Sequence, residues 1–218
     1  MIENYADKTY IINLDERMDR WDLIVSELFK TGIKNYERFS AIKPDRTTIP
    51  KEAYRAMTLA GSNRDKYIVG TVGARASHVG IMKKAQKAGY RQILILEDDV
   101  EFHSEANVIF DNAMEQTKNI NWDMFFLGCN HKEPFDLINT NLARIKRAHA
   151  IHAYLIKDTL FDVIITNAIP SGQEIDVYYY EQIHPNYTCL CTRPHIAWQR
   201  AGFSDLLQEN RDYKVLRR

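Results

Sequence analysis

Apolar and polar positions alternate along the first two thirds of the chain in patterns typical of strands and helices. Residues 9–14, TYIINL, form a short apolar run that ends at Asp15. Apolar side chains then recur at helical spacing until Gly32, at Met18, Trp21, Val25, Leu28 and Phe29. We therefore predict a strand over 9–14, a helix after it and, from YERFSAI, a second strand over 36–42.

Residues 43–70 break this pattern, because prolines and glycines are spread among polar residues. We expect a loop region with a short helix there, and loops of this length often cover a site. From Thr71 to Ala88, apolar and small residues fall on one helical face, and Gly89 is placed to end the helix. This segment is predicted to be a helix that leads into the next strand.

The next segment, QILILEDDVEF at 92–102, contains the run Ile93–Leu96, in which apolar and polar side chains do not alternate. Such a strand is typically covered on both faces, as in the middle of a mostly parallel sheet. WDMFFLG, residues 122–128, is predicted to be its neighbour in the sheet. These elements together predict an α/β fold with a central, mostly parallel sheet flanked by helices.

Composition limits the size of the fold and its partners. The 218 residues suit one sizeable domain with its own core. Lys plus Arg and Asp plus Glu both number 29, so overall charge favours neither nucleic acid nor an anionic membrane as partner. The sequence shows no signal segment and no run near the roughly 20 apolar residues that span a bilayer. We expect a cytoplasmic protein without a membrane span.

The cysteines give little evidence for metal binding. Three cysteines are too few for a disulfide framework and suit a reducing compartment. Cys189 and Cys191 with His195 nearby form only a weak zinc pattern, so we interpret the cysteines as buried strand residues and predict no zinc. His195 as a distal metal ligand has no support from spacing.

Three carboxylates directly follow the apolar run at 93–96, namely Glu97, Asp98 and Asp99. In open α/β sheets, ligands bind beyond the carboxyl ends of the strands. Adjacent carboxylates repel one another, and a divalent cation such as Mg²⁺ or Mn²⁺ supplies the counter-charge and commonly bridges to substrate phosphates. A solvated acidic turn explains these three residues equally well on sequence alone.

Several segments in a fixed order give the chain a specific resemblance. It resembles glycosyltransferase family 25, which includes bacterial lipopolysaccharide galactosyltransferases and collagen galactosyltransferases. The matching segments are YIINLDERMDRW at 10–21, RFSAI at 38–42, the long segment 70–102, WDMFFLG at 122–128, HAYLI at 152–156, EIDVYYYEQ at 174–182 and a P-x4-Q-x4-SD pattern at 194–205. The resemblance implies a single nucleotide-sugar-binding domain of the GT-A type over residues 1–207. We expect residues 208–218 to be a charged, flexible tail.

The resemblance also implies a metal site and a donor site. Asp99 is the expected direct ligand of Mn²⁺ or Mg²⁺, and Glu97 is expected near the metal or the ribose. The other residues expected to bind the nucleotide sugar are Asn13, Arg17, Arg20, Ser77, His78, Asp98, Gln199, Ser204 and Asp205. An Asn at a strand end can read a base or ribose edge, and arginines can pair with pyrophosphate. A solvated helix face remains an alternative for Arg17 or Arg20, close packing for Ser77, and a structural hydrogen bond for His78.

The acceptor side is expected near Asp176. Its IDV tripeptide matches the family motif, in a stretch predicted to begin a helix. An inverting transferase needs a base that takes the acceptor hydroxyl proton, and a carboxylate fits that role. Asp176 is the first candidate, with Glu174 and Asp205 as alternatives. Nearby aromatic residues either stack on sugar rings or pack in the core: Tyr178, Tyr179, Tyr180 and Trp198.

These inferences together predict a metal-dependent, inverting glycosyltransferase. It would move galactose or glucose from a UDP-sugar to a hydroxyl of a glycan or glycoprotein acceptor. One alternative is a relative that binds a nucleotide sugar or glycan without transfer. A second is a metal-dependent phosphohydrolase or nucleotidyltransferase, since three carboxylates after a strand would serve that chemistry as well.

Overall fold

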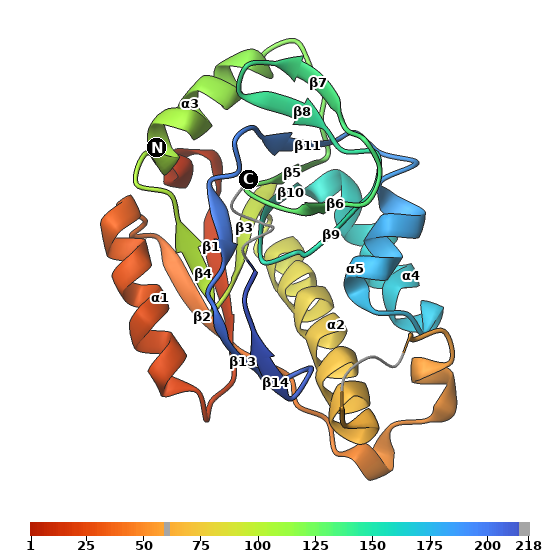
Figure 1. Ribbon diagram of the computed structural model, residues 1–218. Helices are drawn as coiled ribbons and strands as arrows, with labels where there is room; N and C mark the ends of the chain where they lie inside the picture. The colour runs from red at the N-terminus through yellow and green to blue at the C-terminus, as the bar shows by residue number, and fades with distance from the viewer. Residues whose placement is uncertain (59–61, 214–218) are drawn as a thin grey trace.

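A mixed eight-stranded sheet runs through the middle of the molecule, and helices lie on both of its faces (Figure 1). The computed structural model describes residues 1–58 and 62–213. The strand order is β2-β1-β3-β10-β5-β11-β8-β7. These strands are β1 (Lys8–Asn13), β2 (Tyr36–Ser40), β3 (Gln92–Glu97), β5 (Met124–Phe126), β7 (Asp136–Asn139), β8 (Leu142–Arg144), β10 (Ala153–Lys157) and β11 (Cys189–Thr192).

The sheet is mostly parallel in strand direction. β10 and β8 run against the other six strands, so β2, β1 and β3 pair in parallel, as do β5 and β11. This confirms the predicted fold class. The strand at 122–128 is not the direct neighbour of β3, because the antiparallel β10 lies between β3 and β5. That prediction was wrong, because apolar strands covered on both faces carry no signal that says which edge they pair with.

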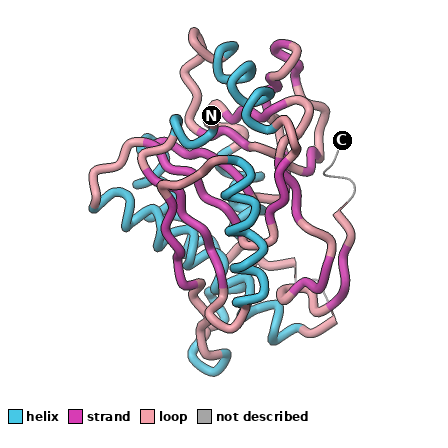
Figure 2. The backbone as a smooth tube through the Cα atoms, turned by 90° about the vertical axis from the view of Figure 1, so that its left-hand side faces the viewer, coloured by secondary structure: helices cyan, strands magenta, loops and turns pink. Residues whose placement is uncertain are grey.

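The helices form two layers, and Figure 2 shows them in front of and behind the strands. They are α1 (Met18–Thr31), α2 (Arg64–Lys87), α3 (Ala106–Gln116), α4 (Phe161–Ser171) and α5 (Ile175–Tyr178). Short 3-10 helices occur at Ile2–Tyr5, Arg46–Thr48, Lys51–Tyr54 and Asp158–Leu160, and a π-helix at Tyr179–Ile183. None of the helices within the described ranges is long and apolar enough to cross a membrane.

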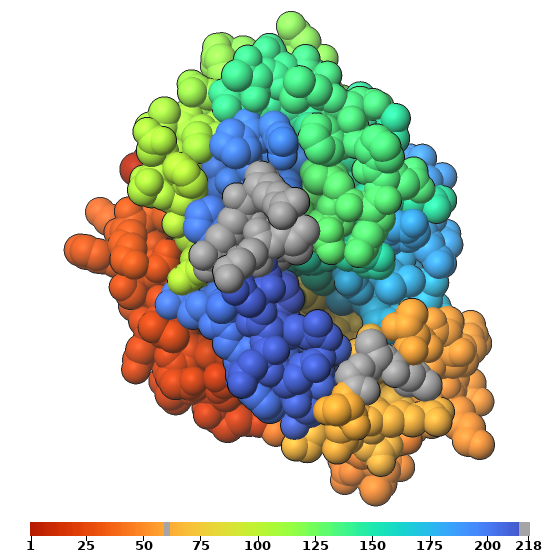
Figure 3. Space-filling view, in the orientation of Figure 1, coloured from red at the N-terminus to blue at the C-terminus, as the bar shows by residue number. Residues whose placement is uncertain are grey.

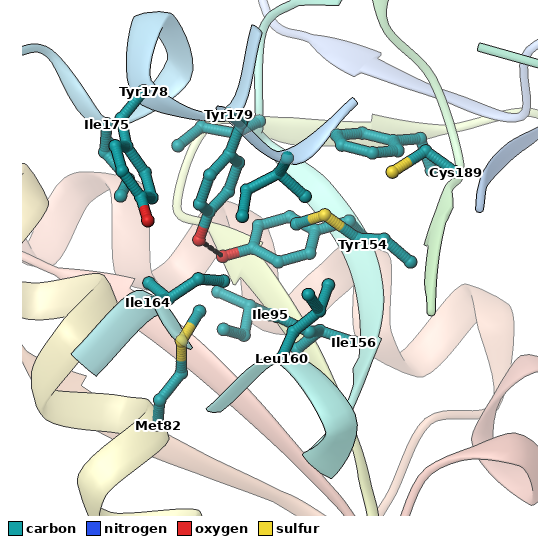
Figure 4. Close-up of a cluster of buried hydrophobic side chains, with 14 of the residues drawn as sticks. Met82, Ile95, Tyr154, Ile156, Leu160, Ile164, Ile175, Tyr178, Tyr179 and Cys189 are labelled. Carbon is teal, nitrogen blue, oxygen red and sulfur yellow. Dashed lines mark hydrogen bonds between the residues drawn. The ribbon is translucent and has the colours of Figure 1, made fainter. Parts of the chain in front are cut away.

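Alternate residues of β3 face the two helical layers. Ile93 and Ile95 pack in the cluster that includes residues of α2, α4 and α5, whereas Leu94 and Leu96 pack in the cluster that includes α1 and α3. All four side chains are fully buried. The prediction of a strand covered on both faces is therefore confirmed. Figure 4 shows part of the first cluster, in which the hydroxyls of Tyr154 and Tyr179 are 3.2 Å apart.

Two helices differ in detail from the sequence prediction. α2 begins at Arg64 instead of Thr71, because the side chain of Asn63 accepts a hydrogen bond from the Lys66 backbone N–H and caps the helix there. Gly89 follows the helix with φ +72°, as expected of a helix end. In α1, Leu28 is buried but Phe29 is 87% exposed, since consecutive residues of a helix point about 100° apart.

Three two-stranded ribbons complete the fold. They are β4 (Val100–Phe102) with β12 (Ala197–Gln199), β6 (Asn130–His131) with β9 (Ala148–His149), and β13 (Gly202–Ser204) with β14 (Glu209–Arg211). The last ribbon includes part of the segment expected to be a flexible tail, so residues 209–211 are a paired strand. The final residues of that segment, 214–218, lie outside the described residues.

Candidate functional site

A cleft of about 1070 Å³ lies beyond the carboxyl ends of β1 and β3. Its walls include the turn after β3, the first half of α2, residues 149–151 and 174–176 around β9 and the start of α5, and residues 203–208. Lys66 of α2 donates a hydrogen bond to the side chain of Gln208 at 2.7 Å, so the C-terminal segment closes one side of the cleft. Figure 3 shows this deep-blue segment between the N-terminal residues and the beginning of α2.

Glu97 and Asp99 lie at the centre of this cleft. Glu97 is the last residue of β3, and Asp99 follows in the turn that leads to β4. Gln199 pairs with Val100 across the β4–β12 ribbon, and its amide nitrogen lies 3.4 Å from Glu97 Oε2 and 3.4 Å from Asp99 Oδ2. Within the described residues, Asp99 Oδ1 is buried without a hydrogen-bond partner.

The two carboxyl groups are costly to ionise where they lie. Burial, together with the neighbouring Asp98 charge, raises the pKa of Glu97 to about 7. Burial and then the charges of Glu97 and Asp98 raise the pKa of Asp99 to about 8. A divalent cation would remove both penalties, and carboxylate oxygens are the ligands that Mg²⁺ and Mn²⁺ take. The donor set and the unpartnered Asp99 oxygen therefore fit a hard divalent cation.

The raised pKa values predict how stability depends on pH. A carboxyl group with a raised folded-state pKa holds its proton more tightly when folded, so its ionisation disfavours the folded state. The loss of stability starts above the ordinary carboxyl pKa of about 4 and is complete above about 8. In chelator, we expect the free energy of unfolding of the wild type to fall by about 1 kcal/mol relative to Asp99→Asn between pH 6 and pH 8.

Denaturant unfolding at several pH values measures this difference. Mn²⁺ should abolish the fall in the wild type and have little effect on Asp99→Asn. Wild-type and variant free energies that stay parallel across this pH range would contradict the raised pKa values. The comparison is restricted to pH 6 and above, because the pKa values of His78, His152 and His184 are lowered by burial and act at lower pH.

Asp98 has a different environment from its two neighbours. Asn13 donates to its Oδ2 at 2.7 Å, and Arg20 donates to its Oδ1 at 3.1 Å. Burial raises the pKa of Asp98, and the Arg20 charge and these hydrogen bonds oppose that rise. Asp98 therefore has two side-chain donors within the protein and fixes the turn that presents Glu97 and Asp99.

The remaining residues expected at the donor site fall into two groups. Arg20, Ser204 and Asp205 line the cleft, whereas Asn13 and Arg17 are not among the residues that line it. Asn13 is buried and accepts a hydrogen bond from Arg38 at 2.8 Å in addition to its bond to Asp98. Arg17 pairs with Asp205 and with the neighbouring Asp19. The structure thus brings Arg20 and Asp205 to the cleft surface, where Arg17 pairs with Asp205, and Asn13 bonds to Asp98.

Ser77 and His78 of α2 line the cleft but also have internal partners. The Ser77 hydroxyl donates to the Gly73 carbonyl and accepts from the Ile42 N–H, both at 2.8 Å. A Cβ at Gly73 would lie 2.1 Å from the Ile42 carbonyl oxygen, so only glycine lets this loop approach the helix. The loop brings Lys43 to the cleft.

His78 is a buried, neutral imidazole. Its Nδ1 lies 2.7 Å from the Tyr154 hydroxyl, and the two rings stack at 5.8 Å. Burial lowers the pKa of His78 to about 3. Its Nε2 lies 3.8 Å from Glu97 Oε1. His78 therefore lies between the buried Tyr154 and the carboxylate pair of the cleft.

Asp176 lies in the cleft at the start of α5, as the predicted helix start required. Its Oδ1 accepts a hydrogen bond from the Val177 N–H at 2.9 Å, and its Oδ2 lies 3.3 Å from His149 Nδ1. His149 in turn stacks on Tyr180 at 4.9 Å. The Asp176 side chain is 33% exposed, so this carboxylate is oriented by the protein and still accessible from the cleft.

Glu174, the alternative base, is held more tightly. Its Oε1 accepts hydrogen bonds from the Thr58 N–H, the Thr58 hydroxyl and the Tyr67 hydroxyl at 2.6–2.9 Å. The residue is only 6% exposed. Glu174 therefore fastens the segment before α2 to the start of α5.

The aromatic residues considered as sugar platforms are mostly placed elsewhere. Tyr178 and Tyr179 are buried in the core cluster, as Figure 4 shows. Trp198 donates to Glu101 at 3.1 Å from the β4–β12 ribbon. Tyr180 supports His149, so none of the four lines the cleft.

The cleft lining also includes residues that sequence reasoning did not single out, and four of them carry side chains that can be cationic: Lys43, Arg46, Lys66 and His149. Three of them come from the segment 43–70, which was expected to cover a site but gave no residue-level signal. His149 lies on the two-residue strand β9, which is too short to produce a periodic pattern.

One family and several known proteins are similar to this chain. The family model described as "Glycosyltransferase family 25 (LPS biosynthesis protein)" matches residues 6–166. The human protein named "Inactive glycosyltransferase 25 family member 3" is 26% identical over 137 residues, which is 59% of this chain. This chain spans 22% of the length of that relative.

Two solved structures align with this chain over most of its length. A glycosyltransferase involved in the glycosylation of the major capsid of PBCV-1 aligns with a TM-score of 0.50 and 9% identity, over 91% of this chain and 94% of that chain. UDP-glucose pyrophosphorylase complexed with UDP-glucose aligns with a TM-score of 0.47 and 9% identity, over 85% of this chain and 89% of that chain.

Proposed function

This chain belongs to glycosyltransferase family 25, and on that premise we propose that it is a metal-dependent, inverting hexosyltransferase. The donor is a UDP-sugar that carries galactose or glucose, and the acceptor is a hydroxyl of a glycan or glycoprotein. The observation that carries the proposal is the pair Glu97 and Asp99, which face the cleft beyond the carboxyl end of a central strand. Their raised pKa values mark a place where positive charge is needed.

In this proposal, Glu97 and Asp99 hold a Mn²⁺ or Mg²⁺ ion. When bound, the ion neutralises the charge that develops on the departing diphosphate. Gln199 orients both carboxylates, and Asp98 is kept in place by Asn13 and Arg20. Arg20 also offers positive charge at the cleft surface, where it can contact a diphosphate oxygen.

Asp176 is the proposed general base. The acceptor hydroxyl loses its proton to the Asp176 carboxylate while its oxygen forms a bond to C1 of the sugar, and the bond from C1 to the diphosphate oxygen breaks on the opposite face. His149 positions Asp176 through the 3.3 Å contact. Asp176 is favoured over Glu174 and Asp205 because Glu174 already accepts three hydrogen bonds and Asp205 is paired with two arginines.

A second candidate function is binding of a nucleotide sugar without transfer. The name of the human relative, which calls that protein inactive, favours keeping this alternative. In that case the cleft would bind UDP and a cation, but no sugar would reach an acceptor.

A nucleotide-sugar panel with Mn²⁺ tests the proposal. We expect UDP release above background with one UDP-hexose, and a dependence of that release on Mn²⁺. UDP binding without turnover, under any acceptor mixture, would support the binding-only alternative. Release of pyrophosphate from a nucleoside triphosphate and a sugar phosphate would indicate a nucleotidyltransferase instead.

Arg20 and Arg17 provide a matched pair for testing the donor site. Arg20→Ala should raise the KM for the UDP-sugar by roughly 10- to 100-fold, the value of a charge-assisted hydrogen bond to phosphate. Arg17→Ala should have a smaller effect, because Arg17 does not line the cleft and pairs with a residue that does, Asp205. Steady-state kinetics measure both effects. Equal KM values for the two variants would show that Arg20 does not contact the donor.

A further inference from the structure

A second cluster of side chains, outside the cleft, has the composition of a zinc site. Cys129, His131, Cys191 and His195 each offer one ligand atom, and these four atoms all lie within 4.8 Å of one another. Both cysteines and His195 are buried, and His131 is half-buried. We propose that these four residues bind a structural Zn²⁺ ion, at a site separate from Glu97 and Asp99.

The distances between the ligand atoms match a tetrahedral site. Zn–S bonds of about 2.3 Å and Zn–N bonds of about 2.0–2.1 Å place adjacent sulfur and nitrogen ligands about 3.5 Å apart. His131 Nε2 lies 3.5 Å from Cys129 Sγ and 3.7 Å from Cys191 Sγ. His195 Nε2 lies 3.9 Å from Cys129 Sγ. These three distances are within about 0.4 Å of the separation expected in a tetrahedral zinc site, so small shifts would complete it.

The charge and softness of the ligands select zinc. Two thiolates neutralise the two charges of Zn²⁺, and two neutral imidazoles complete the set, so the buried group carries no net charge. Thiolates are soft ligands, whereas Mg²⁺ and Mn²⁺ take oxygen. The two proposed sites therefore select different ions: the oxygen pair in the cleft takes a hard cation and the sulfur and nitrogen cluster takes zinc.

The sequence alone does not reveal this site, because its ligands come from two distant segments. Cys129 and His131 follow β5, whereas Cys191 lies in β11 and His195 comes after it. β5 and β11 pair in parallel with Phe126 opposite Cys191, and this pairing brings the two segments together. Cys189, which looked like the natural partner of Cys191 in sequence, packs among the core residues of Figure 4 instead.

A zinc ion at this position would stabilise two elements that reach the cleft. His131 is next to Asn130, which pairs with His149 across the β6–β9 ribbon, and His149 orients Asp176. His195 lies just before β12, which carries Gln199 to Glu97 and Asp99. The proposed zinc ion thus has a structural role, because it would hold in place the β6–β9 ribbon and β12, which both carry residues of the cleft.

Metal content is the first test. Wild-type protein is loaded with Zn²⁺ under a reductant, dialysed against a weak chelator and analysed by mass spectrometry of the metal. We expect about one zinc ion per chain. Cys189→Ser, the matched control from the same strand, and Glu97→Gln/Asp99→Asn should both keep it, whereas Cys191→Ser should lose it. A wild type without zinc, or a loss in either control as large as in Cys191→Ser, would overturn the proposal.

Two measurements on the wild type do not depend on whether variants fold. Protein loaded with Co²⁺ should show the sulfur-to-cobalt charge-transfer band and the intense visible bands of tetrahedral cobalt; weak octahedral bands alone would overturn the site. For the second measurement, zinc-loaded protein is purified without reductant, unfolded and freed of metal. Thiol titration of this sample should detect all three cysteines. Detection of a single thiol would show a Cys129–Cys191 disulfide in place of the metal.

Thermal unfolding tests whether the bound zinc ion stabilises the folded protein or binds without a structural role. Because zinc binds the folded chain, its removal with a strong chelator should lower the Tm of the wild type by about 5 °C or more. The carboxylate variant Glu97→Gln/Asp99→Asn should show the same fall, since it keeps the zinc site. An unchanged Tm in both proteins would contradict a structural role.

Discussion

Asp99→Asn is expected to abolish metal binding in the cleft, UDP binding and transfer together. The substitution keeps the shape of the side chain but removes the charge that a divalent cation requires. Transfer should fall by at least about 10³-fold, because the charge stabilisation of a departing diphosphate is worth several kcal/mol. Calorimetry with UDP, in Mn²⁺ and in chelator, together with a UDP-release assay, measures the three losses.

Glu101→Gln is the matched control for Asp99→Asn. Glu101 lies two residues further along, on β4, and accepts a hydrogen bond from Trp198 outside the cleft. This variant should bind UDP and Mn²⁺ as the wild type does. If UDP binds equally well in chelator and to Asp99→Asn, the assignment of the cation to Glu97 and Asp99 is wrong.

Asp176→Asn is expected to separate binding from chemistry. Asp176 faces the cleft with His149 at its side, and its hydrogen-bond partners differ from those of Asp98. UDP and Mn²⁺ affinity should therefore stay close to wild type. Transfer to acceptor should fall by roughly 10²- to 10⁴-fold, the usual contribution of a positioned base. Calorimetry and single-turnover transfer measure the two properties on the same preparation.

Glu181→Gln serves as the control for Asp176→Asn, since Glu181 is exposed and bonds to Gln173 outside the cleft. His149→Ala should reduce kcat less than Asp176→Asn does and leave the donor KM unchanged, as expected of a positioning residue. Near-normal transfer by Asp176→Asn would move the search for the base to Glu174 and Asp205. Loss of UDP binding in Asp176→Asn would place Asp176 among the nucleotide or metal contacts.

Local patterns predicted the main elements because they report burial within one segment. The uninterrupted apolar run Ile93–Leu96 required cover on two faces, and both core clusters provide it. Gly32 and Gly89 end their helices with positive φ, as their positions after apolar periodic segments indicated. The prediction that the strand at 122–128 lies next to β3 was wrong, because β10 lies between them. Strand pairing depends on segments that are far apart in sequence, and a local pattern does not report it.

The candidate site likewise has a part that the sequence predicts and a part that only the tertiary structure shows. Three carboxylates after a buried strand single out Glu97, Asp98 and Asp99, and the resemblance to glycosyltransferase family 25 favours a metal site over a solvated acidic turn. The different environments of these three residues came only from the structure: Asp98 contacts Asn13 and Arg20, which lie 85 and 78 residues earlier in the chain. No pattern along the chain reports such contacts.

By itself, the sequence determined the α/β class, the central strand and the position of the carboxylates at its end, because each depends on the chemistry of neighbouring residues. Only the tertiary structure decided that His149 faces Asp176 and that Arg20 lines the cleft whereas Asn13 and Arg17 do not. It alone also gathered Cys129 and His131 with Cys191 and His195. The physical reason is that side-chain periodicity records which face of an element is buried, whereas the assembly of a site depends on which elements pair.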